Sequence, residues 1–125
     1  MKTILVIEDD KFMRDLLINK IKKEGFRADG AASAEEALEE MEKNAPNLIL
    51  LDLILPRMDG FEFIQHMKKN PQFANIPILI LSNLGDKKDI EKAEQFGVKE
   101  FLIKANFTPS EIVQKIHDLL NKKYL

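Results

Sequence analysis

Cysteine and tryptophan are absent from the 125 residues, which include only one tyrosine and two histidines. Without cysteine the chain has no disulfide, no thiolate metal site and no thiol nucleophile. Long hydrophobic runs are absent as well. The first apolar run, residues 4–7, stops at three acidic residues and is too short for a signal peptide or a membrane span. We therefore expect no membrane association, and the cytoplasm is the default location.

The sequence also has no large excess of charge of one sign, since 19 basic residues are balanced by 21 acidic ones and the formal net charge is -2. No global positive field is available to hold nucleic acid or an anionic membrane, so direct nucleic-acid binding is not expected. Hydrophobic residues make up 45% and charged residues 32%, enough to form a core and to cover it. The length predicts one domain over residues 1–125.

Short continuous apolar runs predict buried strands at residues 4–7, 48–51, 78–81 and 101–103, with a weaker one near residues 26–28. Helical spacing between the runs predicts helices over 11–24, from a capping box at Ser33 to the residues before Pro46, over 60–70, over 88–96, and from Pro109 nearly to Leu125. The alternation predicts an α/β fold. We expect a doubly wound (βα)5 arrangement, a five-stranded parallel sheet with helices on both faces.

In such sheets the functional site lies outside the carboxyl ends of the strands. The polar residues that directly follow the predicted strands are Glu8, Asp9 and Asp10, then Asp52, then Ser82 and Asn83, and finally Lys104. Carboxylates ~4 Å apart repel by roughly 4 kcal/mol per pair at an effective dielectric constant near 20, so a cation is the natural compensation. Oxygen ligands without nearby His or Cys predict Mg²⁺, and a carboxylate nucleophile beside a lysine and a hydroxyl predicts formation of an acyl phosphate.

Four segments in this order resemble the receiver domains of two-component response regulators, whose smallest members are single-domain chemotaxis and phosphorelay regulators. They are the strand end at residues 4–10, the segment LDLILPRMDG at 51–60, Leu81 with Ser82, and Lys104. The resemblance covers the whole chain. It implies a flavodoxin-like sheet with strand order 2-1-3-4-5.

The resemblance also assigns roles to residues. Asp52 would accept a phosphoryl group from a histidine kinase or a histidine phosphotransfer protein, and the chain would catalyse only its own phosphorylation and dephosphorylation. Mg²⁺ would be bound by Asp9, Asp52, the carbonyl of Ile54 and, through water, Glu8. Ser82 and Lys104 would bind the phosphoryl group, and Ser82 and Phe101 would act as the switch. The fourth helix, fifth strand and fifth helix would then present a changed face to an unidentified downstream protein.

Several neighbouring residues have simpler interpretations. Asp10 and Asp59 are predicted to cap helices, and His66 and His117 are predicted to lie on the surface, away from the site. Phe12 and Leu16 lie at the edge of the first helix's apolar stripe, where they would either contact the kinase or phosphotransfer protein or pack into the core. Ile54 and Leu84 are placed to flank the acyl phosphate, and by blocking water they would slow its hydrolysis.

Two positions depart from the family pattern. Ala105 stands where the family commonly has a proline after a cis peptide bond, so the loop before the fifth helix is expected to differ. Asn83 stands where the family usually has a smaller residue, beside the phosphate. It would change access to the site or bond to the loop.

Three other functions fit the sequence less well. A phosphatase that forms a phosphoaspartate usually has a second Asp at the position of Ile54. A flavin or nucleotide carrier needs a glycine-containing first loop, whereas this loop is acidic. A receiver-like interaction module that works without phosphorylation would not need the complete set of acidic, hydroxyl and lysine residues.

Overall fold

The computed structural model describes residues 1–121 and contains one five-stranded sheet. The strands are β1 (Thr3–Ile7), β2 (Arg27–Ala31), β3 (Leu48–Leu51), β4 (Ile78–Ser82) and β5 (Glu100–Ile103). All neighbouring pairs are parallel, and the order is β2-β1-β3-β4-β5. The predicted doubly wound parallel sheet and its strand order are therefore confirmed.

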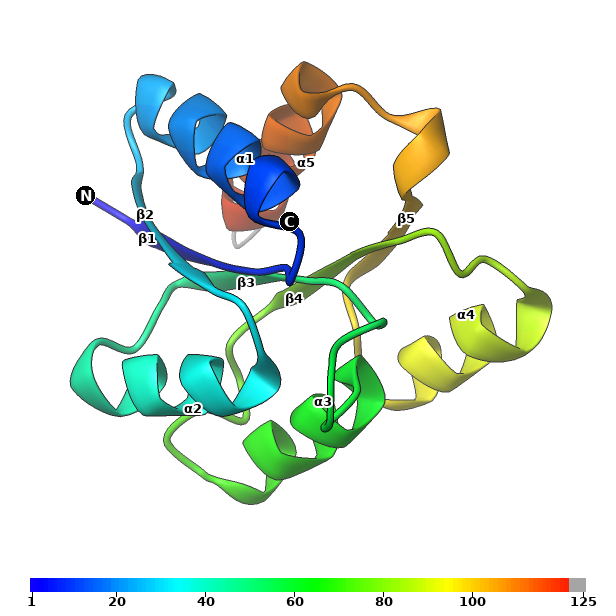
Figure 1. Cartoon of the computed structure of the whole chain (residues 1–125). Coiled ribbons are helices and arrows are strands. Elements are labelled where there is room, and N and C mark those ends of the chain that lie inside the picture. Colours follow the sequence, from blue (N-terminus) through cyan, green and yellow to red (C-terminus); the bar gives the residue numbers. More distant parts are fainter. Residues whose placement is uncertain (122–125) are drawn as a thin grey trace.

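Five α-helices cover the sheet: α1 (Lys11–Lys23), α2 (Ala34–Lys43), α3 (Gly60–Lys69), α4 (Lys87–Gln95) and α5 (Pro109–Asn121). Helices α1 and α5 lie on one face, and α2, α3 and α4 lie on the other (Figure 1). The predicted extension of the fifth helix beyond Asn121 lies outside the described residues. No helix within residues 1–121 is long and apolar enough to cross a membrane.

The two faces of the sheet bury separate apolar layers because successive side chains along a strand point to opposite sides. On β1, Ile4 and Val6 face the layer under α1 and α5, whereas Leu5 and Ile7 face the layer under α2, α3 and α4. All four side chains are almost completely buried. A strand buried on both faces explains why the apolar run is continuous rather than alternating.

Strand β2 differs from its prediction. It was expected near residues 26–28, but it covers Arg27–Ala31 and includes the polar segment Asp29-Gly30. Its position is set by pairing with β1, from Thr3 opposite Arg27 to Ile7 opposite Ala31. Because β2 is an edge strand, its polar residues are tolerated, and the pairing overrides the local composition.

The helix N-termini agree with the capping predictions. The side chains of Asp10, Ser33 and Asp59 accept hydrogen bonds from the backbone N–H groups three residues later, and Thr108 accepts one from Glu111. The capping box at Ser33 departs in one detail, since the Glu36 carboxylate accepts from the N–H of Ala32 rather than from that of Ser33. These caps fix where each helix leaves the carboxyl edge of the sheet.

Candidate functional site

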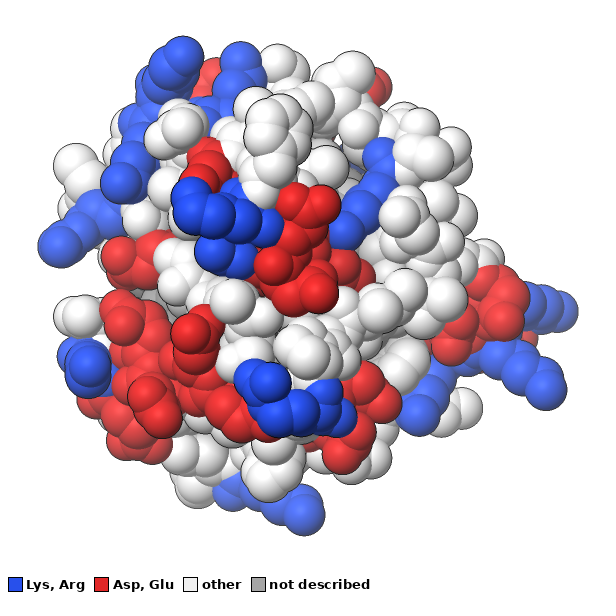
Figure 2. All heavy atoms as spheres, in the orientation of Figure 1, with Lys and Arg blue, Asp and Glu red and all other residues white. Residues whose placement is uncertain are grey.

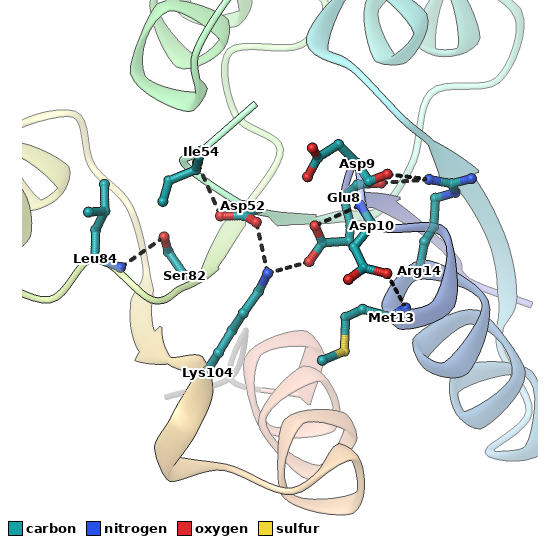
Figure 3. Close-up of polar contacts among 10 residues, drawn as sticks. All are labelled: Glu8, Asp9, Asp10, Met13, Arg14, Asp52, Ile54, Ser82, Leu84 and Lys104. Atoms are coloured by element: carbon teal, nitrogen blue, oxygen red, sulfur yellow. Dashed lines mark hydrogen bonds and ion pairs between the residues drawn. The ribbon is translucent and has the colours of Figure 1, made fainter. Parts of the chain in front are cut away.

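Three carboxylates meet at the carboxyl ends of β1 and β3 (Figure 3). Because Ile7 pairs with Leu51, the next residues of the two strands, Glu8 and Asp52, are held side by side, and the Asp52 N–H donates to the Ile7 carbonyl at 3.0 Å. Carboxylate oxygens of Glu8, Asp9 and Asp52 all lie within 4.8 Å of one another. Glu8 and Asp52 are buried and Asp9 is exposed, so the cluster is open on the side of Asp9.

Lys104 connects this cluster to the end of β5. Its Nζ donates to Asp52 Oδ2 at 2.8 Å and also to Glu8 Oε1 (Figure 3). The lysine side chain is only 15% exposed. Burial works to lower the pKa of Lys104, but the hydrogen bonds to Asp52 and Glu8 outweigh it, so its pKa lies above the ordinary value of 10.5.

Glu8 has the opposite balance. Burial raises its pKa above the ordinary value of 4.5, the hydrogen bond from Lys104 opposes this, and the neighbouring charge of Asp52 raises the pKa again. The three carboxylates of the cluster face a single ammonium group, so their formal charges are not balanced. The site favours an additional positive charge.

The loop after β1 is held from several directions. Asp10 caps α1 through Met13, and its own N–H donates to Glu8 Oε2 at 3.2 Å. Arg14, one turn into α1, donates from Nη1 to the carbonyl oxygens of Glu8 at 2.8 Å and of Asp9 at 3.4 Å. Asp10 is thus a cap, as predicted. It is not in the carboxylate cluster.

The loop after β3 begins with a hydrogen bond from the Ile54 N–H to Asp52 Oδ1 at 3.1 Å. The Ile54 side chain is 53% exposed and points to the rim of the site (Figure 3). Gly60 closes this loop tightly, since a β-carbon there would lie 2.7 Å from the Leu53 Cα and 2.9 Å from the Asp52 carbonyl oxygen. Only glycine permits this approach.

The end of β4 supplies Ser82, which is fully buried. Its Oγ accepts a hydrogen bond from the Leu84 N–H at 3.3 Å and lies on the side of Asp52 opposite Glu8 (Figure 3). Phe101 of β5 is half-buried and packs against the core. A cavity of about 250 Å³ lies beside it, lined by Ile90, Ala93, Glu94, Val98, Lys99, Glu100 and Phe101.

Other predicted residues lie away from the cluster. His66 is exposed, as expected, whereas His117 is half-buried. The prediction of a surface His117 is therefore wrong in part, because its ring packs 4.8 Å from that of Phe26. No cis peptide bond occurs in residues 1–121, and Lys104–Asn106 forms one turn of 3-10 helix at the Ala105 position.

The exposure of the two α1 side chains tests one of their two interpretations, core packing, and the contact with a kinase or phosphotransfer protein stays a prediction. Phe12 is 77% exposed and Leu16 is 39% exposed, so core packing is the wrong alternative for both. Ile54 and Leu84, in the loops after β3 and β4, are also exposed. Exposed apolar side chains thus lie both on α1, which begins just after Asp10, and in these two loops.

The donor set fits a hard divalent cation. Three carboxylates and one ammonium group give the cluster a formal charge of about -2, and every candidate ligand atom is oxygen. Figure 2 shows acidic side chains at the surface near the start of α1, with basic side chains on both sides. The predicted residues Glu8, Asp9, Asp52 and Lys104 thus lie together.

Arg14 was missed by sequence reasoning. Long helical side chains lean toward the helix N-terminus, so a residue one turn after the Asp10 cap is placed to reach back over the loop. The spacing between Asp10 and Arg14 was the one signal in the sequence for this contact. The signal is weak, because most basic residues at such positions remain in solvent.

The comparisons with known proteins agree with this geometry. Residues 4–117 match the family model of the response regulator receiver domain. A probable transcriptional regulator ycf27 from Cyanophora paradoxa is 33% identical over 121 residues, which are 97% of this chain and 49% of that protein. The chain thus spans about half the length of the curated relatives it matches.

Solved structures show the same fold. A putative response regulator from Chloroflexus aurantiacus is 30% identical with a TM-score of 0.87, covering 97% of this chain and 98% of that one. A CheY-like receiver domain protein from Methanospirillum hungatei, at 24% identity, has a TM-score of 0.89 and covers 98% and 95% of the two chains. The chain belongs to the response regulator receiver domain family of two-component systems.

Proposed function

We propose that this chain is a phosphorylation-dependent switch in which Asp52 accepts a phosphoryl group in a Mg²⁺-dependent reaction. The donor would be a phosphohistidine on a histidine kinase or a phosphotransfer protein. The observation that carries the proposal is the position of Asp52, whose carboxylate lies within 4.8 Å of Glu8 and Asp9 oxygens and 2.8 Å from the Lys104 Nζ.

Mg²⁺ would be held by Asp9, Asp52 and the Ile54 carbonyl, with Glu8 contributing through water. The bound cation would neutralise negative charge on the transferred phosphoryl group. The exposed side of the cluster, at Asp9, leaves room for the coordinated waters that Mg²⁺ usually keeps.

The chain's own residues would perform the transfer. A carboxylate oxygen of Asp52 attacks phosphorus, the bond from phosphorus to the donor imidazole breaks, and the electron pair leaves with the imidazole nitrogen. Lys104, already paired with Asp52, then pairs with a phosphoryl oxygen. Because Ser82 Oγ accepts from the Leu84 N–H, its hydroxyl hydrogen is free to be donated to another phosphoryl oxygen.

Movement of Ser82 and Lys104 toward the phosphoryl group would be the first step of signal output. Phe101 packs only in part against the core and borders the cavity between α4 and β5, so its ring has space to rotate. The face formed by α4, β5 and α5 would change and bind a downstream protein differently.

Phe12 and Leu16 would contact the phosphoryl donor. Both are exposed apolar residues on α1, the helix that starts next to Asp9 and Asp10. An apolar contact beside the nucleophile would align a histidine-bearing helix of the donor with Asp52.

Two alternatives remain weaker. The phosphatase function lacks its second acid, because Ile54 occupies the required position. A module that works without phosphorylation does not account for a partly buried lysine shared by two buried carboxylates.

Binding of beryllofluoride, a mimic of the phosphoryl group, tests the proposal. Fluorine NMR with and without Mg²⁺ would compare the wild type with Asp52→Ala and with Asp10→Asn, a neighbouring acid that serves as a cap. We expect Mg²⁺-dependent binding in the wild type and Asp10→Asn and none in Asp52→Ala. Binding that survives in Asp52→Ala, or is absent from the wild type, contradicts the proposal.

A further inference from the structure

The guanidinium group of Arg14 is bonded to the backbone that carries two of the proposed metal ligands. Nη1 donates to the carbonyl oxygen of Glu8 at 2.8 Å and to that of Asp9 at 3.4 Å (Figure 3). These carbonyls follow the last paired residue of β1, so they have no partner in a strand ladder at this point. Arg14 therefore closes the loop from the side of α1.

The same loop is held from β2, where the Glu8 N–H donates to the Ala31 carbonyl at 3.0 Å. Glu8 is thus fixed through both of its backbone polar groups, by a neighbouring strand on one side and by Arg14 on the other. Fixing the backbone restricts where the Glu8 and Asp9 carboxylates can lie.

Gly30 of β2 makes room for the arginine. A β-carbon at this position would lie 3.1 Å from Arg14 Cδ, 3.2 Å from Arg14 Cγ and 2.7 Å from Ile18 Cδ1. Gly30 does not have a positive φ, so conformational freedom is not the reason for glycine here. The nearest of these atoms is the flexible end of the Ile18 side chain, and the two Arg14 atoms are slightly farther away, so glycine at this position leaves space for both α1 side chains.

We infer that Arg14 is a positioning residue for the Mg²⁺ site, and that Gly30 leaves the space in which its side chain lies. The inference rests on the proposed function, because it presupposes that Glu8, Asp9 and Asp52 bind Mg²⁺. Arg14 contacts the carbonyls rather than the carboxylates, so its main effect is to preorganise the ligands.

Arg14 could affect Mg²⁺ binding by holding the ligands in place or by its own positive charge, and these two effects predict opposite changes in Mg²⁺ affinity. If Arg14 positions the ligands, Arg14→Met weakens Mg²⁺ binding by about tenfold, as loss of an outer-shell contact typically does. If Arg14 acts as a nearby positive charge, the same substitution strengthens Mg²⁺ binding, because a repulsive cation is removed.

Calorimetric titration with Mg²⁺ distinguishes these outcomes in the wild type, Arg14→Met, Arg14→Lys and Gly30→Ala. Arg27→Met is the matched control, since Arg27 is exposed and lies at the opposite end of β2, paired with Thr3. We expect weaker binding in Arg14→Met, a smaller loss in Gly30→Ala because the α1 side chains can shift slightly, partial recovery in Arg14→Lys, and no change in Arg27→Met. A structural role in folding alone would lower stability without changing Mg²⁺ affinity.

Amide hydrogen exchange gives a readout that needs no metal. In the chelated protein we expect faster exchange of the Glu8 and Asp10 amides in Arg14→Met than in Arg27→Met. Unchanged or tighter Mg²⁺ binding in Arg14→Met overturns the inference and leaves the proposed function intact. A wild type that binds no Mg²⁺ overturns both.

Discussion

Lys104 donates hydrogen bonds to two buried carboxylates, those of Glu8 and Asp52. Their side chains are 3% and 7% exposed, so neither can recover solvation if the lysine is removed. Loss of one partner from a buried ion pair costs more than the pair itself contributes, because an uncompensated charge remains.

We therefore expect Lys104→Met to lower the free energy of unfolding by about 3 kcal/mol in chelator. Mg²⁺ should restore part of this loss, since a bound cation takes over the compensation. Urea denaturation with and without Mg²⁺ measures both effects, and Lys99→Met, at an exposed position just before β5, is the control. A loss no larger than that of Lys99→Met would show that Lys104 is not needed to compensate the carboxylates.

Glu8 gives the site a pH dependence of defined sign. Its pKa is raised in the folded protein, so the folded state binds a proton more readily than the unfolded chain does. Its contribution to stability is fully present below the ordinary value of 4.5 and is lost as pH rises through the folded pKa.

In chelator, the wild type should gain stability relative to Glu8→Gln as the pH falls from neutrality toward 4.5. The measurement is the difference between the unfolding free energies of the wild type and Glu8→Gln at several pH values. Groups that titrate equally in both proteins do not contribute to this difference. A constant difference, or one that favours Glu8→Gln at lower pH, would show that the Glu8 pKa is not raised.

Most residues of the cluster were predictable because they directly follow buried strands, and parallel strands bring their carboxyl ends to one edge. Arg14 was not, because its contact depends on how a helical side chain leans over the loop and on the space left by Gly30. The half-buried state of His117 was missed for a similar reason, since it depends on packing against Phe26.

At the scale of elements, the β3–α3 connection is tightly constrained by its sequence. Gly60 begins α3 against the backbone of Leu53 and Asp52, where a β-carbon would be only 2.7 Å from the nearest atom. Backbone cannot yield as a flexible side chain can. The close approach at Gly60 therefore lets the β3–α3 connection hold Asp52 and Ile54 in place.

Gly60→Ala should destabilise the protein by about 1–3 kcal/mol and also weaken Mg²⁺ binding, because the displaced backbone carries Asp52. Gly25→Ala is the comparison: Gly25 has a φ of 92° in open space, so alanine there is strained but far from the site. We expect Gly25→Ala to lower stability without changing Mg²⁺ affinity. Equal Mg²⁺ affinity in Gly60→Ala and the wild type would contradict the role given to this connection.

The loops after β3 and β4 place Ile54 and Leu84 at the rim, 53% and 39% exposed. If they obstruct the approach of water to the phosphoryl group, Ile54→Ala with Leu84→Ala should speed self-dephosphorylation by about tenfold, equivalent to about 1.4 kcal/mol. Loss of phosphoryl label over time measures the rate, and Leu16→Ala, at an exposed apolar position on α1, is the control. A wild-type phosphoryl lifetime of seconds, or no acceleration in the variant, would defeat the obstruction hypothesis.

Element boundaries show where local sequence is sufficient. Helix starts were well predicted, because Asp10, Ser33, Asp59 and Thr108 are short-range caps. Strand β2 was shifted from its predicted place because its extent is decided by pairing with β1, a contact between distant segments. The local sequence pattern around β2 contains no information about its pairing with β1.

For the whole molecule, the continuous apolar strands and alternating helices were enough to predict a doubly wound sheet, and the order β2-β1-β3-β4-β5 was implied by the family resemblance. This topology brings residues from β1, β3, β4 and β5 to one edge, although Glu8 and Lys104 are separated by 96 positions. The site is thus a property of the complete sheet rather than of any one segment.

Phosphorylation of Asp52 is the central claim, and intact-mass analysis after incubation with acetyl phosphate tests it most directly. We expect the wild type to gain the mass of one phosphoryl group in Mg²⁺ and not in chelator, with the modification mapped to Asp52. We expect Asp52→Ala to gain none, whereas Asp59→Asn, altered at a helix cap, should gain it as the wild type does. Modification that is absent from the wild type, or retained in Asp52→Ala, would contradict phosphorylation of Asp52.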